Sequence, residues 1–208
     1  LLGLVGAWGC SSDSASGVDA GSSSSSSSSS SGSSSDASAT SDGSSSADAG
    51  ADVAPVPFAV TSKVLTEGGT FPKDQTCDGK DESPDLTWTE GPAGTKSYGI
   101  ILNDTSIKFV HSSVYDIPKG SLGVPQAMDK KAEPSAPAGA KQTKNYKGTY
   151  GYTGPCPPSG EHVYEFVVYA LDVETLPGVT TASTRQEVET AMKAHSVGTV
   201  RITSKYKR

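Results

Sequence analysis

The chain has 208 residues and a formal net charge of −6 at pH 7, and its composition changes along its length. Residues 11–57 are mostly Ser, Ala, Gly and Asp, with ten consecutive serines (Ser22 to Ser31) and no Lys or Arg. Six aspartates in this stretch carry the whole net charge, because 17 acidic and 17 basic residues lie elsewhere. A neutral remainder without a basic stripe gives no indication of a nucleic-acid surface.

Residues 1–10, LLGLVGAWGC, consist of nine apolar or small residues followed by Cys10. Nine residues are too few to span a bilayer, so we predict a truncated secretory signal. Ala7-Trp8-Gly9-Cys10 resembles a bacterial lipoprotein box, which predicts lipidation of Cys10 and export to the cell envelope on a lipid anchor. Ser11 after the cysteine favours the outer membrane. An ordinary signal-peptide tail is the alternative.

Residues 11–57 hold too few apolar side chains to offset the entropy lost on ordering. We predict a disordered tether with an r.m.s. span of roughly 35–40 Å.

The remaining two cysteines, Cys77 and Cys156, form an even pair that an exported protein can oxidise. A disulfide between them, or two free thiols, are the two possibilities.

Residues 58–208 are enough for one domain with its own core. Apolar and β-branched runs predict four strands, at 97–104, 108–117, 162–173 and 198–206. Helical spacing of Val188 and Met192 predicts a helix over 184–196, with Thr184 as its N-cap. These elements predict a mainly β fold, a two-sheet sandwich with one or two short helices.

The long segment 118–161 is rich in Pro, Gly and Lys, and we expect it to pack against the sheet or to build a site. Its lysines at 129–147 form either a solvated loop or a face for a protein partner.

No phosphate-binding loop, nucleophile elbow, zinc-protease motif or dinucleotide fingerprint occurs. We therefore do not expect an enzyme, a metal site or a cofactor.

Near the end of this segment stands GPCPPSG, residues 154–160. Proline fixes φ and glycine permits unusual φ, so this turn has few accessible conformations. It can present backbone N–H groups, those of Gly154, Cys156, Ser159 and Gly160, to a small ligand. His162 and Tyr164 follow two residues apart on a predicted strand and face the same side. Both side chains could instead be satisfied core residues.

Several segments together resemble the phosphatidylethanolamine-binding protein family, in particular its bacterial and archaeal Raf-kinase-inhibitor-like branch. They are TCDGKDESPDLTW (76–88), GPAGTKSYGIILND (91–104), FVHSSVYDIP (109–118), NYKGTYGYTGPCPPSGEHVYEFVVYALD (145–172) and MKAHSVGTVRITSKYKR (192–208). The resemblance covers essentially all of 58–208. It implies a two-sheet β-sandwich with a small anion-binding pocket at one end.

The resemblance also implies the pocket residues, which are Asp104, His111, Gly154, Pro155, Cys156, Pro157, His162 and Tyr164, with Asp78 near the rim. We expect Asp104 to orient an imidazole by accepting its N–H. The chain departs from the family pattern after Asp104, where Thr105-Ser106-Ile107 replaces the usual Pro and second Asp. Ser112 and Val163 stand where relatives often have Trp and Arg, which predicts a less acidic and more open pocket.

Three functions are consistent with these residues. The first is a lipid-anchored binding module for a small anion, such as phosphate or a phospholipid head group. The second is a protein-interaction or inhibitor domain of the cell envelope, acting on a serine protease or, less in keeping with export, on a kinase. The third is a hydrolase, for which Cys156 would be a poor nucleophile because prolines flank it.

Overall fold

The computed structural model describes residues 56–208. The predicted signal and lipoprotein box in 1–10, with Cys10, and nearly all of the predicted tether in 11–57 lie outside the described residues. They stay predictions. Within residues 56–208, no helix has both the length and the apolar character needed to cross a bilayer.

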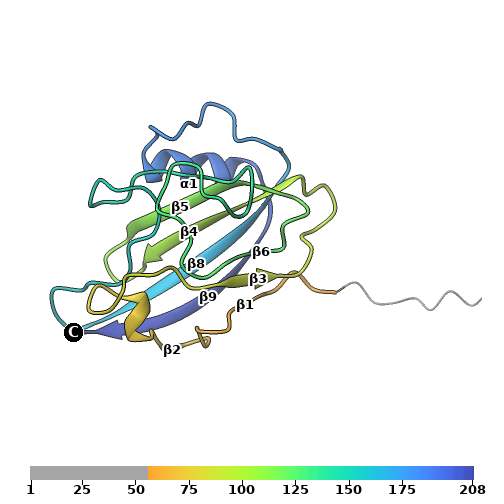
Figure 1. Ribbon diagram of the computed structural model, residues 1–208. Coiled ribbons are helices and arrows are strands. Elements are labelled where there is room, and N and C mark those ends of the chain that lie inside the picture. Colours follow the sequence, from red (N-terminus) through yellow and green to blue (C-terminus); the bar gives the residue numbers. More distant parts are fainter. Residues whose placement is uncertain (1–55) are drawn as a thin grey trace, which may run out of the picture. The chain divides into compact units, whose positions relative to one another are not determined.

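The described residues form two β-sheets (Figure 1). The larger sheet has six strands, antiparallel except for the β2–β9 pair, in the order β2 (Gly69–Thr70), β9 (Ser196–Lys207), β8 (Glu161–Leu171), β4 (Ser97–Asp104), β5 (Phe109–Pro118) and β7 (Lys141–Gln142). The smaller sheet has three antiparallel strands, β1 (Val60–Thr61), β3 (Leu86–Trp88) and β6 (Gly123–Val124). This architecture confirms the predicted mainly β, two-sheet fold.

The helical content also agrees with the prediction. The described part of the chain contains one α-helix, α1 (Arg185–Ala194), and a single 3-10 turn at Lys73–Gln75. Thr184 caps α1 as expected: its hydroxyl accepts the Glu187 N–H at 3.2 Å, and the Glu187 carboxylate accepts the Thr184 N–H at 2.7 Å. This reciprocal capping box satisfies two donors that the first turn would otherwise leave unpaired.

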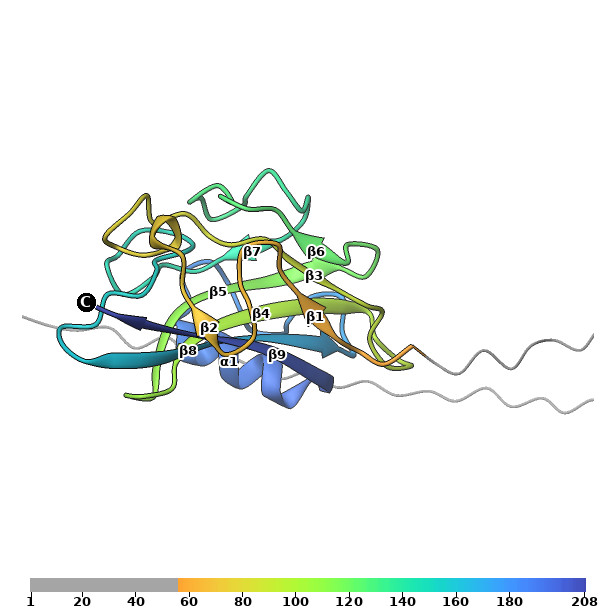
Figure 2. The same cartoon turned by 90° about the horizontal axis from the view of Figure 1, so that it is seen from below.

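The central strands β4 and β5 of the six-stranded sheet are buried on both faces. Figure 2 shows α1 on one side of the sheet and β3 and β6 on the other. Successive residues of a strand point to opposite faces. Ile100 therefore packs in the core between the sheets, whereas Ile101 packs against Val188 and Met192 of α1. This double burial explains why β4 is an unbroken apolar run rather than an alternating one.

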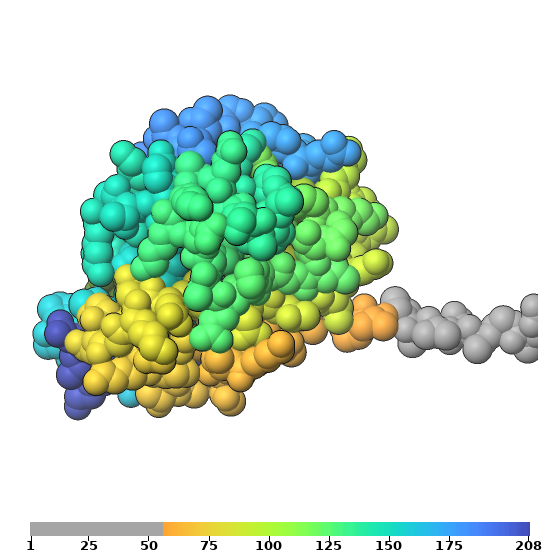
Figure 3. All heavy atoms as spheres, viewed as in Figure 1, coloured from red at the N-terminus to blue at the C-terminus, as the bar shows by residue number. Residues whose placement is uncertain are grey.

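The segment between β5 and β8 packs against the sheet, as its length predicted. Its strand β7 pairs with β5, and the buried Gln142 side chain donates to the carbonyl groups of Asp129 at 2.7 Å and Lys131 at 2.8 Å. Residues 119–150 cover a wide part of the face seen in Figure 3. The segment thereby brings its later residues to one end of the sheet.

Candidate functional site

A cavity with a volume of about 200 Å³ lies where β4 ends and where β5 and β8 begin. Its lining residues are Asp104, Ile107, Phe109, His111, Tyr146, Cys156, Pro157, Pro158, His162 and Tyr164. Six residues of the predicted site are therefore brought together. The two histidines converge on one space because β4 pairs with both β5 and β8.

Asp104 fixes the His162 ring. Its carboxylate oxygen Oδ2 lies 2.6 Å from His162 Nδ1, and its other oxygen accepts the Ser106 N–H at 3.0 Å. The Asp104 side chain is only 2% exposed, so this contact is poorly screened by water. A carboxylate can only accept, so Nδ1 carries the hydrogen and Nε2 is left for a ligand. The predicted orienting role of Asp104 agrees with this geometry.

A β-bulge directs His111. Asn103 pairs with Val110 and Leu102 with Ser112, which leaves His111 as an extra residue on β5. Val110 consequently packs in the core beneath α1, whereas Ser112 lines the space between the two sheets. Without the bulge these two side chains would share one face. The extra residue turns the imidazole toward the cavity.

The His111 ring is also fixed through Nδ1, which donates to the Thr153 carbonyl at 3.2 Å. Burial lowers the pKa of His111, and the nearby Arg185 and Lys147 charges lower it further, although the Thr153 bond and Asp104 act in the opposite direction. The ring is 5% exposed. The neutral imidazole, with a free Nε2, is therefore favoured more than in water.

Tyr164 packs between the two imidazoles. Its ring lies 5.4 Å from that of His111, edge to face, and 6.3 Å from that of His162, nearly parallel. Burial raises the pKa of Tyr164 well above its usual value; the Asp104 charge and a hydrogen bond to it add to this, and a backbone hydrogen bond with Cys156 opposes it. The hydroxyl thus stays protonated beside the Asp104 carboxylate.

Apart from Pro158, which belongs to the predicted proline-rich turn, three lining residues were missed by the sequence interpretation. Phe109 and Tyr146 each lie 5.3 Å from the His111 ring, edge to face, and Ile107 is 58% exposed at the mouth. Phe109 could have been found, because it stands two residues before His111 on the same strand. Tyr146 lies in the lysine-rich loop, where no periodic pattern marks it.

The proline-rich turn forms one wall through Cys156, Pro157 and Pro158. Gly154 and Pro155 do not line the cavity, and the prediction that Gly154 offers its N–H to a ligand is wrong. That N–H donates to the Asp81 carboxylate at 2.6 Å. A Cβ at Gly154 would lie 2.1 Å from the Gln75 carbonyl oxygen, so only glycine fits this close approach.

Of the two possibilities left open for Cys77 and Cys156, the structure shows the disulfide. Cys77 and Cys156 are bonded, with their Cα atoms 5.4 Å apart, and the Cys77 N–H donates to the Pro155 carbonyl at 3.1 Å. These links hold the turn against residues 74–82.

Asp78, predicted at the rim, is not a lining residue: it accepts from the Tyr206 hydroxyl at 2.7 Å and pairs with Arg208 at 3.0 Å.

The profile of the family described as "Phosphatidylethanolamine-binding protein" matches residues 61–207. The chain belongs to this family. A UPF0098 protein of Aquifex aeolicus is 40% identical over 72% of this chain and 88% of the relative. The "Putative lipoprotein LppC" of Mycobacterium tuberculosis H37Rv is 32% identical over 69% of this chain and 72% of the relative.

Solved structures support the same family fold. The crystal structure of Escherichia coli YbcL, described as a new member of the mammalian PEBP family, matches with a TM-score of 0.67 and 32% identity, over 73% of this chain and 98% of that protein. The homologue CT736 of Chlamydia trachomatis matches with a TM-score of 0.60 and 28% identity, over 73% of this chain and 97% of that protein.

This family member compensates for its unusual turn after Asp104. The Thr105 N–H donates to the Val163 carbonyl at 2.9 Å, and the Val163 N–H donates to the Ser106 hydroxyl at 2.9 Å. Residues that replace the expected Pro and Asp thus tie the β4–β5 turn to β8. The tie holds Asp104 and His162, which flank it, in register.

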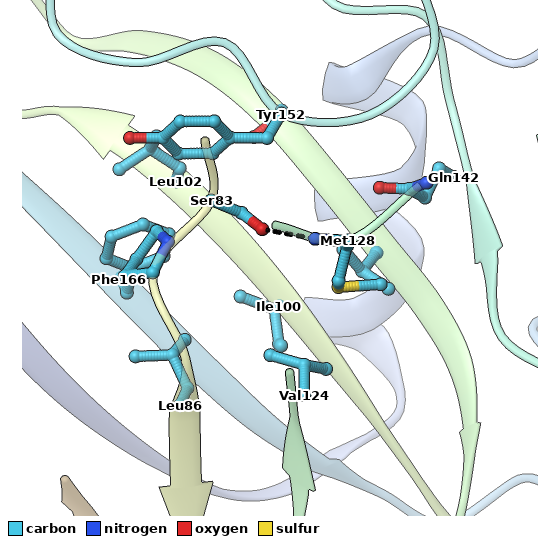
Figure 4. Close-up of a pocket in the computed structure, with 12 residues that line it drawn as sticks. Ser83, Leu86, Ile100, Leu102, Val124, Met128, Gln142, Tyr152 and Phe166 are labelled. Atoms are coloured by element: carbon cyan, nitrogen blue, oxygen red, sulfur yellow. Dashed lines mark hydrogen bonds between the residues drawn. The ribbon is translucent and has the colours of Figure 1, made fainter. Parts of the chain in front are cut away.

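A second, smaller cavity of about 30 Å³ lies between the sheets (Figure 4). Its lining is mainly aliphatic and aromatic, and its Ser83 hydroxyl already accepts the Met128 N–H at 2.9 Å. It contains no titratable side chain other than the Tyr152 phenol, which donates to the Gln75 carbonyl. The histidine-lined cavity is therefore the better candidate for a charged ligand.

Metal chemistry has little support in the described residues. No group of three or more His, Cys, Asp or Glu side chains within 56–208 is arranged to hold a metal ion. The histidine-lined cavity offers two imidazole nitrogens, and its carboxylate is already hydrogen-bonded to His162. A structural or catalytic site normally needs at least three protein ligands.

Proposed function

We propose that this protein is a non-catalytic binding module that holds a small oxyanion, of the phosphate or phospholipid head-group kind, in the histidine-lined cavity. One observation carries the proposal: His111 and His162 line one cavity, and each has its Nδ1 held by an internal acceptor. Fixed rings reduce the entropy lost when a ligand binds. A volume of about 200 Å³ suits a phosphate group with a short substituent.

Nuclear magnetic resonance tests this proposal directly. Methyl phosphate at millimolar concentration is expected to shift the ring signals of His111 and His162 and to leave His195 unchanged. His195 is a matched control, since it also pairs through Nδ1 with an aspartate, Asp172 at 2.9 Å, but lies outside the cavity. No shift at either cavity histidine would contradict the proposal.

The second candidate is a protein-interaction or inhibitor domain. Ile107 is 58% exposed and Tyr146 is 38% exposed, and both lie at the mouth of the cavity. Exposed aromatic and aliphatic side chains are typical anchors of protein interfaces. Pull-down from envelope extracts with an Ile107→Ser, Tyr146→Ser variant, set against a His111→Gln variant, separates the two functions.

We further infer that the protein is exported and lipid-anchored through Cys10. The box at residues 7–10 and the lipoprotein name of the M. tuberculosis relative support this location. The disulfide agrees with an oxidising compartment. Metabolic labelling with a radioactive fatty acid tests it: label is expected in the full chain and not in a Cys10→Ser variant.

A hydrolase is disfavoured, because the Cys156 thiol is bonded in the disulfide and cannot act as a nucleophile.

A further inference from the structure

Arg185 does not line the cavity, but its guanidinium reaches the backbone that carries two of the cavity rings. It is the first residue of α1, and it is half-buried. Its Nε–H donates to the Val110 carbonyl at 2.8 Å, and its Nη1 donates to the Lys144 carbonyl at 3.3 Å. Its Cζ lies 5.6 Å from the centre of the Phe109 ring. One side chain thus joins α1 to the start of β5 and to the loop before β8.

The contact with Val110 acts on His111. The Val110 carbonyl belongs to the same planar peptide unit as the His111 N–H, so a bond to this carbonyl restrains the plane from which the imidazole projects. This peptide unit lies in the bulge where the pairing of β5 with β4 changes register. A bulge disrupts the ladder of hydrogen bonds and leaves its extra residue unpaired. The guanidinium therefore restrains the backbone where the ladder is interrupted.

The contact with Lys144 acts on Tyr146, which lies in a tight turn directly after it. Asn145 closes this turn, because its N–H donates to the Thr149 carbonyl at 2.7 Å. Since the turn is held by its own hydrogen bonds, a restraint on the Lys144 carbonyl also restrains the Tyr146 ring. That ring lines the cavity and lies 5.3 Å from the His111 ring, edge to face.

The position of Arg185 in the helix points to a role outside the helix. The N-terminus of an α-helix carries a partial positive charge, which favours acidic side chains and disfavours a cation. Glu187 follows this preference in the same turn, whereas Arg185 does not. Its hydrogen bonds to Val110 and Lys144 account for a cation at this position. A lysine could not make both, because its ammonium group lacks the planar fork of donors.

Resting on the proposed function, we propose that Arg185 is a positioning residue of the oxyanion site, whose guanidinium holds the His111 and Tyr146 walls at the spacing that a bound oxyanion needs. Arg185 acts through these two residues and does not touch the ligand. Restrained walls reduce the entropy lost on binding, so a loss of the restraint weakens affinity even when the protein stays folded.

Calorimetric titration of the full chain with methyl phosphate tests the inference. Arg185→Met removes the charge and both hydrogen bonds, whereas Arg185→Lys keeps the charge and loses the fork. Both variants are expected to bind methyl phosphate about tenfold or more weakly than wild type, as for the loss of a hydrogen bond made by a charged group. In the ligand-free variants, nuclear Overhauser effects between the His111 and Tyr146 rings should weaken.

Two control variants separate positioning from general effects. Arg201→Lys makes the same change at an exposed arginine, which pairs with Glu165 at 3.2 Å outside the cavity. Val188→Ala removes a buried contact of α1 and leaves the guanidinium in place. We expect both controls to keep the affinity and the ring contacts of wild type, while Val188→Ala lowers the unfolding midpoint.

Three outcomes would overturn the inference and leave the proposed function standing. Wild-type affinity in Arg185→Lys would show that the charge alone matters. An equal loss of affinity in Val188→Ala would show that any loosening of α1 is sufficient. Unchanged ring contacts in Arg185→Met would show that the guanidinium does not hold the two walls. Absence of binding by wild type itself would reject the proposed function and the inference with it.

Discussion

His162 Nδ1 lies 2.6 Å from Asp104 Oδ2, a contact between the start of β8 and the end of β4. We expect Asp104→Ala to release the ring, since no other acceptor for Nδ1 occurs among the described hydrogen bonds. Nitrogen-15 spectra should then show His162 as a mixture of tautomers instead of the Nδ1–H form. Loss of a hydrogen bond to a charged group costs about 1.5–3 kcal/mol, so affinity for methyl phosphate should fall about tenfold or more.

The control for this change is Asp172→Ala, which removes the partner of His195 at 2.9 Å on the surface. It is expected to alter the His195 signals and to leave both His162 and ligand affinity unchanged. A His162 tautomer that is the same with and without the Asp104 carboxylate would show that Asp104 does not position the ring.

His111 makes folding stability depend on pH. Because burial lowers its pKa, the folded protein binds fewer protons at this site than the unfolded chain does. Its contribution is therefore complete above the unfolded pKa of about 6.5 and is lost as pH falls toward the folded pKa. Urea unfolding at pH 7.5 and pH 5 should show wild type losing more stability than His111→Gln. A difference between the two proteins that does not change with pH would contradict this cause.

Much of the fold was predictable because its longest elements carry strong local signals. The strand β8 is rich in β-branched and aromatic residues, and α1 has a capping box, so both were found within one or two residues. Strands such as β1 and β6 have two residues each. So short a strand shows no alternation, and only tertiary pairing defines it.

The site was partly predictable for the same reason. His162 and Tyr164 begin a strong strand, and the turn before them is marked by prolines. The bulge at His111 depends on pairing with β4, which no local pattern encodes. Tyr146 reaches the cavity because its loop folds back over the sheet. The Gly154 N–H was misassigned since its acceptor, Asp81, lies 73 residues away along the chain.

The disulfide between Cys77 and Cys156 should contribute strongly to stability, because the two residues are 79 apart in sequence. Closing a loop of this length is worth up to about 4–5 kcal/mol in the chain-entropy treatment, although measured gains are often smaller. A Cys77→Ser, Cys156→Ser variant should lose about 2–5 kcal/mol of unfolding free energy, measured in urea. Dithiothreitol should destabilise wild type to a similar extent and have no further effect on the variant.

Gly154 should be far less tolerant of a side chain than a surface glycine. A methyl group there would meet the Gln75 carbonyl oxygen at 2.1 Å, and both groups belong to backbone that the disulfide holds in place. Gly154→Ala is therefore expected to cost about 1–3 kcal/mol, the range for overpacking a well-packed site. It should also displace the wall at Cys156 and weaken binding of methyl phosphate.

Gly120→Ala is the matched control, because its Cβ would meet nothing within 4 Å and its φ lies outside the left-handed region. We expect this change to alter the unfolding free energy by less than about 0.5 kcal/mol. Thermal unfolding of both variants measures the contrast. Equal midpoints for Gly154→Ala and Gly120→Ala would show that the turn can move away from Gln75, and that its position against residues 74–82 does not depend on glycine.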